Sequence, residues 1–137
     1  MTVARPVEGE ALPELAKSIT QEQVVAYAEA AGDFNPIHLD PEFAAQTRFG
    51  KRIAHGMLIL AFVSEMMGTA FPATWAKGGS LRVRFRAPVF PGETVTTYGK
   101  IKSMTDRPSG KVAECVVGCR KPDGTDAITG TATVPVK

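Results

Sequence analysis

Two short stretches of the chain hold residue types suited to acid–base chemistry. The first is Gly32–His38, in which Asp33, Asn35 and His38 place a carboxylate, an amide and an imidazole within six residues. A carboxylate and an imidazole directed at one water molecule can take a proton from it and supply a proton elsewhere. We therefore identify Asp33 and His38 as the candidate catalytic pair. The alternative is that Asp33 caps a helix and His38 lies in a surface turn.

The second stretch, Ala54–Met57, opens the most apolar run of the sequence. If Gly56 starts a helix, its N–H has no intrahelical partner and lies at the positive end of the helix dipole. A glycine there lets a ligand approach the backbone, so the Gly56 N–H could hold a developing oxyanion, such as a thioester carbonyl becoming an enolate. The alternative is an ordinary helix start in which His55 only packs. We expect the two stretches to meet in space and form one active site.

Ser64 is a further polar candidate, because it lies inside the apolar run, eight residues after Gly56. A hydroxyl in apolar surroundings needs a hydrogen-bond partner to offset its desolvation. Ser64 can bond back to its own helix or reach the Asp33 carboxylate, and the sequence leaves both open.

Basic residues gather in two places. Arg82, Arg84 and Arg86 alternate along one face of a predicted strand, and Lys51 and Arg52 precede the second stretch. Either group could meet phosphates, as of a coenzyme A or carrier-protein arm. For the three arginines the alternative is a solvated sheet face.

A helix over 21–31 is expected to deliver the first stretch. Thr20 and Gln23 form a capping-box pattern before and within it. Gly32 suits the C′ position that ends a helix, and Pro36 disfavours helical backbone at the residue before it. The apolar residues of this helix recur at helical spacing, namely Val24, Tyr27, Ala28 and Ala31.

The second stretch is expected at the start of a helix over Gly56–Gly68. That run is apolar almost all round, which predicts a buried helix. Asp40-Pro41 is typical of an N-cap followed by the first helical residue, so we expect a further short helix over 41–46. Residues 72–79 are expected to form a loop.

The C-terminal half has the alternation and turns of β-structure. Strands are expected over Ser80–Val89, Glu93–Met104, Lys111–Arg120 and Thr125–Val136, with a short one over Glu14–Ile19. Tight turns between the four long strands predict an antiparallel meander. An all-round apolar helix needs cover, which a curled sheet provides. The expected fold class is α+β, with a long antiparallel sheet packed around one apolar helix.

Length and composition are those of one ordinary globular domain covering residues 1–137, with 44% hydrophobic and 22% charged residues. Sixteen basic against fourteen acidic residues give a net charge of +2, which argues against a dedicated nucleic-acid binder. Cys115 and Cys119 form a C-x-x-x-C pair without a neighbouring histidine, which is a poor zinc site. We expect two packed thiols and no metal.

Targeting signals are not expected. The N-terminus carries Glu8, Glu10 and two prolines in place of an apolar signal region. The longest run without a polar side chain, Gly56–Val63, is shorter than the ~20 residues that span a membrane. These features predict a cytoplasmic protein that does not enter a membrane.

Three segments resemble those of the MaoC-like hydratases. They are Gly32–His38 followed by Ala44, then Ile53–Leu58 (Ile-Ala-His-Gly-Met-Leu), and Phe85–Val89 (Phe-Arg-Ala-Pro-Val). The resemblance runs from about residue 20 to the C-terminus and is strongest to the (R)-specific enoyl-CoA hydratases, which supply polyhydroxyalkanoate synthesis. It implies a single hot-dog domain, a homodimer with acyl tunnels near the interface, and reversible syn hydration of trans-2-enoyl-CoA to (R)-3-hydroxyacyl-CoA. It implies no cofactor, because coenzyme A is part of the substrate.

The resemblance also implies a role for each motif residue. Asp33 and His38 would bind and activate the water, and Asn35 would support the geometry of the site. The Gly56 N–H would hold the thioester oxygen. Ser64 would contact the catalytic aspartate, and Met67, one turn further along, would help to line the acyl pocket.

Other functions stay open from the sequence. A (3R)-hydroxyacyl-ACP dehydratase of fatty-acid synthesis would run the same chemistry in reverse on a protein-borne thioester. A hot-dog acyl-CoA thioesterase also needs a carboxylate and an oxyanion-holding helix start, but not the Asn-Pro-x-His continuation. A non-enzymatic acyl-thioester-binding module is the remaining alternative, and the intact motif argues against it.

Overall fold

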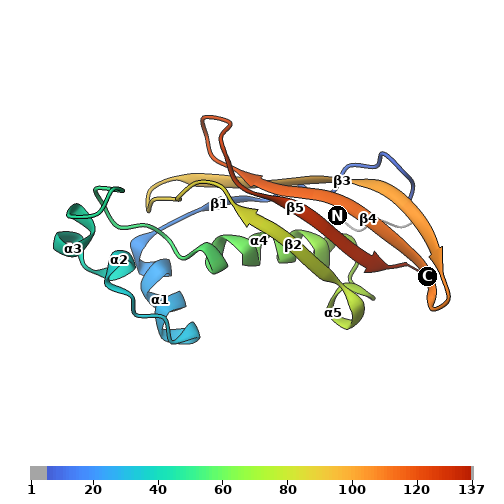
Figure 1. Ribbon diagram of the computed structural model, residues 1–137, viewed down its shortest axis with the longest axis horizontal. Coiled ribbons are helices and arrows are strands. Elements are labelled where there is room, and N and C mark those ends of the chain that lie inside the picture. The colour runs from blue at the N-terminus through green and yellow to red at the C-terminus, as the bar shows by residue number, and fades with distance from the viewer. Residues whose placement is uncertain (1–5, 137) are drawn as a thin grey trace.

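The computed structural model describes residues 6–136, and Figure 1 shows a sheet that bends over one long helix. The strands are β1 (Ala16–Ser18), β2 (Ser80–Phe85), β3 (Thr94–Arg107), β4 (Gly110–Arg120) and β5 (Asp126–Pro135). The helices are α1 (Gln21–Ala31), α2 (Pro36–Leu39), α3 (Pro41–Ala45), α4 (Gly56–Ala70) and α5 (Trp75–Gly78). A sheet curled around a central helix is the hot-dog arrangement, so the expected α+β class is confirmed.

The strand order corrects one expectation. All pairs are antiparallel and the order is β1-β3-β4-β5-β2, so only β3, β4 and β5 form a meander. The first long strand, β2, does not pair with β3 but lies beside β5 at the far edge. Residues 86–93 therefore cross the molecule instead of making a tight turn. On the way Val89 is buried and its carbonyl accepts a hydrogen bond from the Ala54 N–H at 2.8 Å, which ties this crossing to the second motif stretch.

Two glycines lie in one row across the sheet. Gly99 on β3 faces Val117 on β4, which faces Gly130 on β5. A Cβ on Gly99 would lie 2.7 Å from the Val116 carbonyl oxygen, and one on Gly130 would meet the Arg82 carbonyl oxygen. Only glycine permits this close approach of neighbouring strands. A register shift between Ile101 and Ser103 lies next to the row on β3, and such bulges bend a strand further.

Helix α4 packs its buried side against the sheet, where it contacts β3 and β4. Its buried residues are Leu58, Ile59, Phe62, Val63, Met66, Met67 and Ala70. The expectation that this helix is covered all round is wrong for the single chain. Met57, Ala61 and Glu65 form an exposed stripe at a spacing of four residues, which lies on one face of a helix.

The helices before the sheet gather at one end of α4 (Figure 1). Helix α1 has the expected limits, and the Thr20 hydroxyl caps it by accepting from the Gln23 N–H at 3.0 Å. The Gln23 side chain does not complete the expected capping box, because its oxygen is buried without a partner among the described residues. Helices α2 and α5 were not predicted, and α5 occupies part of the expected 72–79 loop.

The two cysteines are free and buried on β4, as expected. Burial is the main cause that raises the pKa of Cys115 to about 11 and that of Cys119 to about 12. Both thiols therefore stay protonated near neutral pH. Within residues 6–136, no helix combines the length and the apolar character that a bilayer crossing demands.

Candidate active site

The end of α1 places Asp33. Gly32 ends the helix in the left-handed conformation with φ 72°, and the N–H groups of Gly32 and Asp33 both donate to the Ala28 carbonyl. The chain thus leaves the helix directly into Asp33, as the sequence predicted. The carboxylate is exposed and accepts a hydrogen bond from the Asn35 N–H at 3.2 Å. This bond orients one carboxylate oxygen and leaves the other free to face a ligand.

The short helix α2 places His38. The Asn35 side-chain oxygen caps this helix by accepting from the Ile37 N–H at 3.1 Å and so fixes the segment that carries His38. The Gln21 amide donates to the His38 carbonyl at 2.9 Å and ties α2 to α1. The sequence showed that a helix could not continue through Asn35, but not that a new one begins after it.

The ring of His38 has a defined orientation. Its Nδ1 lies 2.8 Å from the Ile53 carbonyl oxygen. A carbonyl can only accept, so Nδ1 carries the hydrogen and Nε2 of the neutral ring carries a lone pair. The ring is largely buried, with 8% exposed. His38 is therefore held in the tautomer that can accept a proton from a ligand through Nε2.

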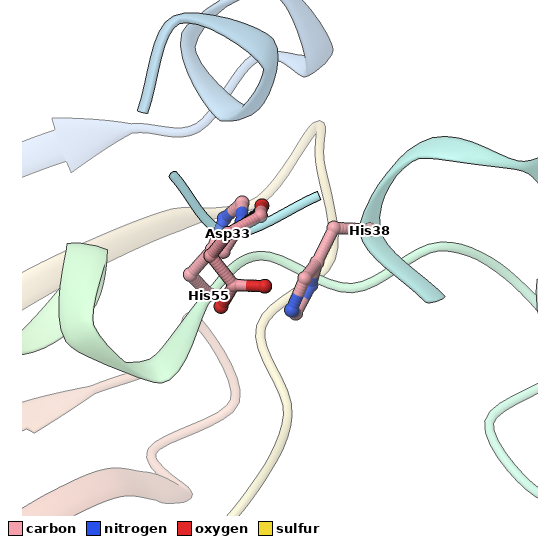
Figure 2. Close-up of side chains that lie close together, drawn as sticks. All are labelled: Asp33, His38 and His55. Carbon is pink, nitrogen blue, oxygen red and sulfur yellow. Dashed lines mark hydrogen bonds between the residues drawn. The ribbon is translucent and has the colours of Figure 1, made fainter. Parts of the chain in front are cut away.

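His55 joins the two motif stretches. Its Nε2 lies 3.1 Å from the Asp33 carbonyl oxygen, and its ring stacks on that of His38 with centroids 3.8 Å apart. Figure 2 shows the three side chains of Asp33, His38 and His55 close together. The expectation that the stretches meet is thus confirmed by the structure. From the sequence only packing was expected of His55, because its partners come from another segment of the chain.

Gly56 opens α4 beside this cluster. The His55 side chain makes no capping hydrogen bond, and Gly56 itself is exposed. A cavity of about 250 Å³ adjoins Gly56, and Ile59, Phe85 and Arg86 also line it. Asp33 and His38 are not part of its lining. The start of α4 therefore adjoins both the acid–base cluster and a cavity with a mixed apolar and arginine lining, where a first-turn N–H can meet a ligand oxygen.

Ser64 and Met67 lie elsewhere. The Ser64 hydroxyl accepts a hydrogen bond from Trp75 Nε1 at 3.0 Å. The expectation that Ser64 contacts Asp33 is therefore corrected, because the hydroxyl bonds to Trp75 instead. Met67 is completely buried in the core and is not among the residues that line the cavity. Its contact with an acyl chain stays a prediction.

The basic residues divide between the cavity and the surface. Arg86 lines the cavity and its Nε donates to the Thr129 hydroxyl at 3.0 Å, whereas Arg82 and Arg84 are exposed on β2. Lys51 lies over the Phe90 ring, with Nζ 4.5 Å from its centroid. A contact of any of these groups with phosphate stays a prediction.

The acid–base cluster has the residue types of a metal site but not its geometry. Asp33, His38 and His55 offer ligand atoms that all lie within 4.8 Å of one another. An ion bound by both imidazoles must lie in both ring planes, at about 2 Å from a nitrogen of each. Rings stacked at 3.8 Å with 27° between their planes share no such point. The arrangement suits proton transfer better, and the expectation of no metal stays a prediction.

Comparisons with known proteins cover nearly the whole chain. The family model described as MaoC like domain matches residues 3–119. A 3-hydroxybutyryl-CoA dehydratase of Methylorubrum extorquens is 41% identical over 106 residues, which is 76% of this chain and 68% of the relative. An (R)-specific enoyl-CoA hydratase of Aeromonas caviae is 35% identical over 121 residues, 88% of each chain. The solved structure of an (R)-hydratase from A. caviae involved in PHA biosynthesis has a TM-score of 0.84 and 32% identity, and the match covers 98% of this chain and 100% of that one.

Proposed function

Because the chain belongs to the MaoC-like domain family, we propose that it is an (R)-specific enoyl-CoA hydratase, a hydro-lyase that adds water reversibly to trans-2-enoyl-CoA to give (R)-3-hydroxyacyl-CoA. One observation carries the proposal. The Asp33 carboxylate and the His38 ring, with its Nε2 lone pair, lie together beside the start of α4, where the Gly56 N–H has no helical acceptor.

The geometry supports a mechanism with two halves. Asp33 and His38 hold one water molecule and share its protons. The water oxygen bonds to C3 of the enoyl chain, and one proton is delivered to C2 on the same face. As the C2–C3 double bond becomes single, negative charge develops on the thioester oxygen, and the Gly56 N–H stabilises it. In total one O–H bond of water breaks and one C–O and one C–H bond form.

A hydration assay with Asp33→Asn tests this function. Wild-type protein is expected to hydrate crotonyl-CoA, and chiral analysis is expected to give the (R) product. Asp33→Asn removes the charge but keeps the size, and we expect kcat to fall about 10³-fold, within the usual range for a lost acid–base group. The same assay with substrates of different chain length measures which length is preferred.

Asp40→Asn is the matched control. Asp40 is also exposed and caps α3 by accepting from the N–H groups of Glu42 and Phe43. Asparagine is an equally good cap, so we expect Asp40→Asn to keep wild-type kcat. Activity of Asp33→Asn within a few-fold of wild type would remove Asp33 from the mechanism. An (S) product would overturn the proposed (R)-specific activity.

Dehydration of a (3R)-hydroxyacyl carrier-protein thioester is the second candidate. The relatives include enzymes named for either direction of the reaction, and the exposed Arg82 and Arg84 would suit an acidic carrier protein. A kcat/KM at least tenfold higher for the acyl carrier protein than for the matching acyl-CoA would favour this candidate. Release of free thiol from saturated acyl-CoA would instead indicate a thioesterase.

The protein that carries out this reaction is proposed to act in the cytoplasm as a homodimer. Support for the dimer comes from the exposed stripe on α4 and from the exposed aromatic residues near the site, Phe34 and Phe85. Acyl-CoA or acyl carrier protein is the proposed partner, and neither nucleic acid, membrane nor a separate cofactor is needed for the chemistry.

A further inference from the structure

His55 has no part in the water chemistry or in oxyanion binding as set out above, yet it is the most buried polar group of the site, with 2% exposed. We propose that His55 is the positioning residue that fixes the water-binding half of the site against the oxyanion-binding half. The proposal rests on the proposed hydratase function and adds to it the group that sets the relation between Asp33, His38 and Gly56.

The hydrogen bond from His55 fixes the segment that carries Asp33. His55 Nε2 lies 3.1 Å from the Asp33 carbonyl oxygen. Because this oxygen can only accept, Nε2 carries the hydrogen and donates it. The Asp33 backbone is thus held from two directions, by this bond and by its own N–H bond to the Ala28 carbonyl at 3.1 Å. The carboxylate extends two bonds from this fixed Cα, and the Asn35 N–H bond orients its oxygen.

The ring of His55 fixes the ring of His38. It lies between Tyr27, with centroids 4.9 Å apart, and His38, with centroids 3.8 Å apart. The edge of the His38 ring is held separately by the Nδ1 bond to the Ile53 carbonyl. A flat neighbour on one face and a hydrogen bond in the plane leave the His38 ring little freedom to turn. This keeps Nε2 directed at the ligand.

The backbone of His55 fixes the oxyanion half. His55 is the N-cap residue of α4, and its carbonyl accepts from the N–H groups of Leu58 and Ile59. The preceding Ala54 is held by its N–H bond to the Val89 carbonyl. One residue therefore contacts Asp33 and His38 with its side chain and positions the Gly56 N–H with its main chain.

A residue needed only for packing would not be histidine at this position. His55 Nδ1 is buried and has no hydrogen-bond partner among the described residues. An unpartnered buried acceptor is destabilising, whereas leucine or phenylalanine would fill the same space without that cost. The donor at Nε2 is the feature that an apolar residue lacks, and it is the one that holds Asp33.

Two variants separate the functions of the His55 side chain. His55→Phe keeps a flat ring between Tyr27 and His38 but has no donor for the Asp33 carbonyl. His55→Gln keeps a donor but has no ring. For His55→Phe we expect kcat to fall about 10²-fold with KM within about threefold, because a misplacement of ~1 Å costs about that much in rate. For His55→Gln we expect kcat within about tenfold of wild type. Thermal melting of each variant checks the fold.

A nitrogen NMR measurement of the histidines provides a second readout. In wild type we expect His38 protonated at Nδ1 and His55 at Nε2. His55→Phe keeps the flat ring, so His38 should keep its tautomer there, and in His55→Gln, which has no ring, we expect His38 to become a mixture of tautomers. His55→Phe with kcat within threefold of wild type would overturn the proposal. If His55→Phe does not fold, folded His55→Gln with wild-type kcat and an unchanged His38 tautomer would overturn it. If wild type hydrates no enoyl thioester, the proposed function fails, and the two tautomers still test whether His55 holds the site.

Discussion

At the scale of single residues, backbone carbonyls decide which ring nitrogens face a ligand. The Ile53 carbonyl takes the Nδ1 hydrogen of His38, and the Asp33 carbonyl takes the Nε2 hydrogen of His55. The two imidazoles therefore carry their hydrogens on different nitrogens although they stack on one another, and only His38 directs its free nitrogen at a ligand. A general base has to be oriented as well as present, so the backbone around the site is part of its chemistry.

Gly56 is the residue at which the smallest change should alter catalysis. A Cβ on Gly56 would lie 2.9 Å from Cε1 of Phe85, so that ring must shift, and both residues line the cavity. For Gly56→Ala we expect kcat/KM to fall about tenfold, because the added methyl group and the displaced ring crowd the place where the thioester oxygen meets the N–H. Steady-state kinetics with crotonyl-CoA measure this effect.

Gly68→Ala is the matched control on the same helix. A Cβ on Gly68 would make an ordinary contact, 3.7 Å from Cδ1 of Trp75. In a helix interior, alanine is more stable than glycine by about 0.5–1 kcal/mol, so we expect Gly68→Ala to melt higher with unchanged kinetics. Gly56→Ala with wild-type kcat/KM would exclude Gly56 from substrate binding.

The sequence predicted Asp33, His38 and Gly56 as site residues because their chemistry and their local signals coincide. A glycine ends the first helix before Asp33, and a glycine starts the apolar helix after His55. The sequence did not predict the partner of Ser64 or the role of His55. Ser64 bonds to Trp75 and His55 to Asp33, which is 22 residues away. Contacts at such separations depend on tertiary packing and have no signature in a single sequence.

At the scale of elements, the helices and the hairpins were predictable from local signals. The cap residues and the apolar periodicity predicted the limits of α1, and the turn residues predicted where β3, β4 and β5 are connected. The position of β2 was not predictable, because an edge strand has the same alternation whichever edge it joins. The helix α2 was missed because its four residues are too few for a periodic pattern.

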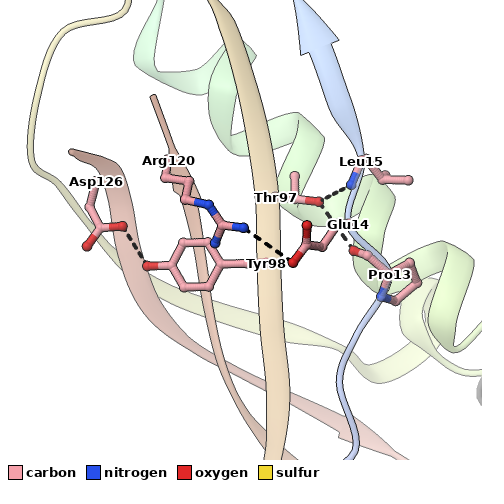
Figure 3. Close-up of polar contacts among 7 residues, drawn as sticks. All are labelled: Pro13, Glu14, Leu15, Thr97, Tyr98, Arg120 and Asp126. Atoms are coloured by element: carbon pink, nitrogen blue, oxygen red, sulfur yellow. Dashed lines mark hydrogen bonds and ion pairs between the residues drawn. The ribbon is translucent and has the colours of Figure 1, made fainter. Parts of the chain in front are cut away.

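The hydrogen bond between Tyr98 and Asp126 links β3 to the start of β5 across β4, and Figure 3 shows it with Arg120 against the Tyr98 ring. Burial, and then the hydrogen bond to Asp126, raise the pKa of Tyr98 from 10.0 to about 12. The unfolded chain therefore loses this proton at a lower pH than the folded protein. The contribution of the protonated Tyr98 hydroxyl to the free energy of unfolding is complete below pH 10 and is lost between pH 10 and about 12.

Urea unfolding between pH 9 and 12 tests this link between strands. We expect the free energy of unfolding of wild type to fall over that range by about 1 kcal/mol more than that of Tyr98→Phe, a value reduced for the partial exposure of the tyrosine. The difference between the two proteins removes the contributions of the cysteines and lysines. Parallel pH dependences of the two proteins would contradict the raised pKa.

At the scale of the whole molecule, the single chain leaves apolar surface next to its own site. Phe34 follows Asp33, Met57 follows Gly56 and Phe85 contacts Gly56, and their side chains are 60%, 57% and 55% exposed. Met57 also begins the exposed stripe of α4, and β2 leaves one edge of the sheet without a strand partner within residues 6–136. Apolar surface of this kind at a sheet edge is typical of an interface.

A second copy of the chain is the occupant that this surface predicts, because a dimer would cover the α4 stripe that the sheet of one chain cannot reach. We expect wild type to have twice the 14.6 kDa mass of the chain in light scattering. Met57→Glu should shift it to the monomer and lower kcat/KM at least tenfold. An acidic residue in the first turn of α4 favours the helix dipole, so the helix itself is not weakened. Val116→Glu is the control. It also replaces an exposed apolar residue by glutamate, but on β4, where Val116 is 37% exposed, and we expect it to stay dimeric. An active wild-type monomer would contradict the dimer.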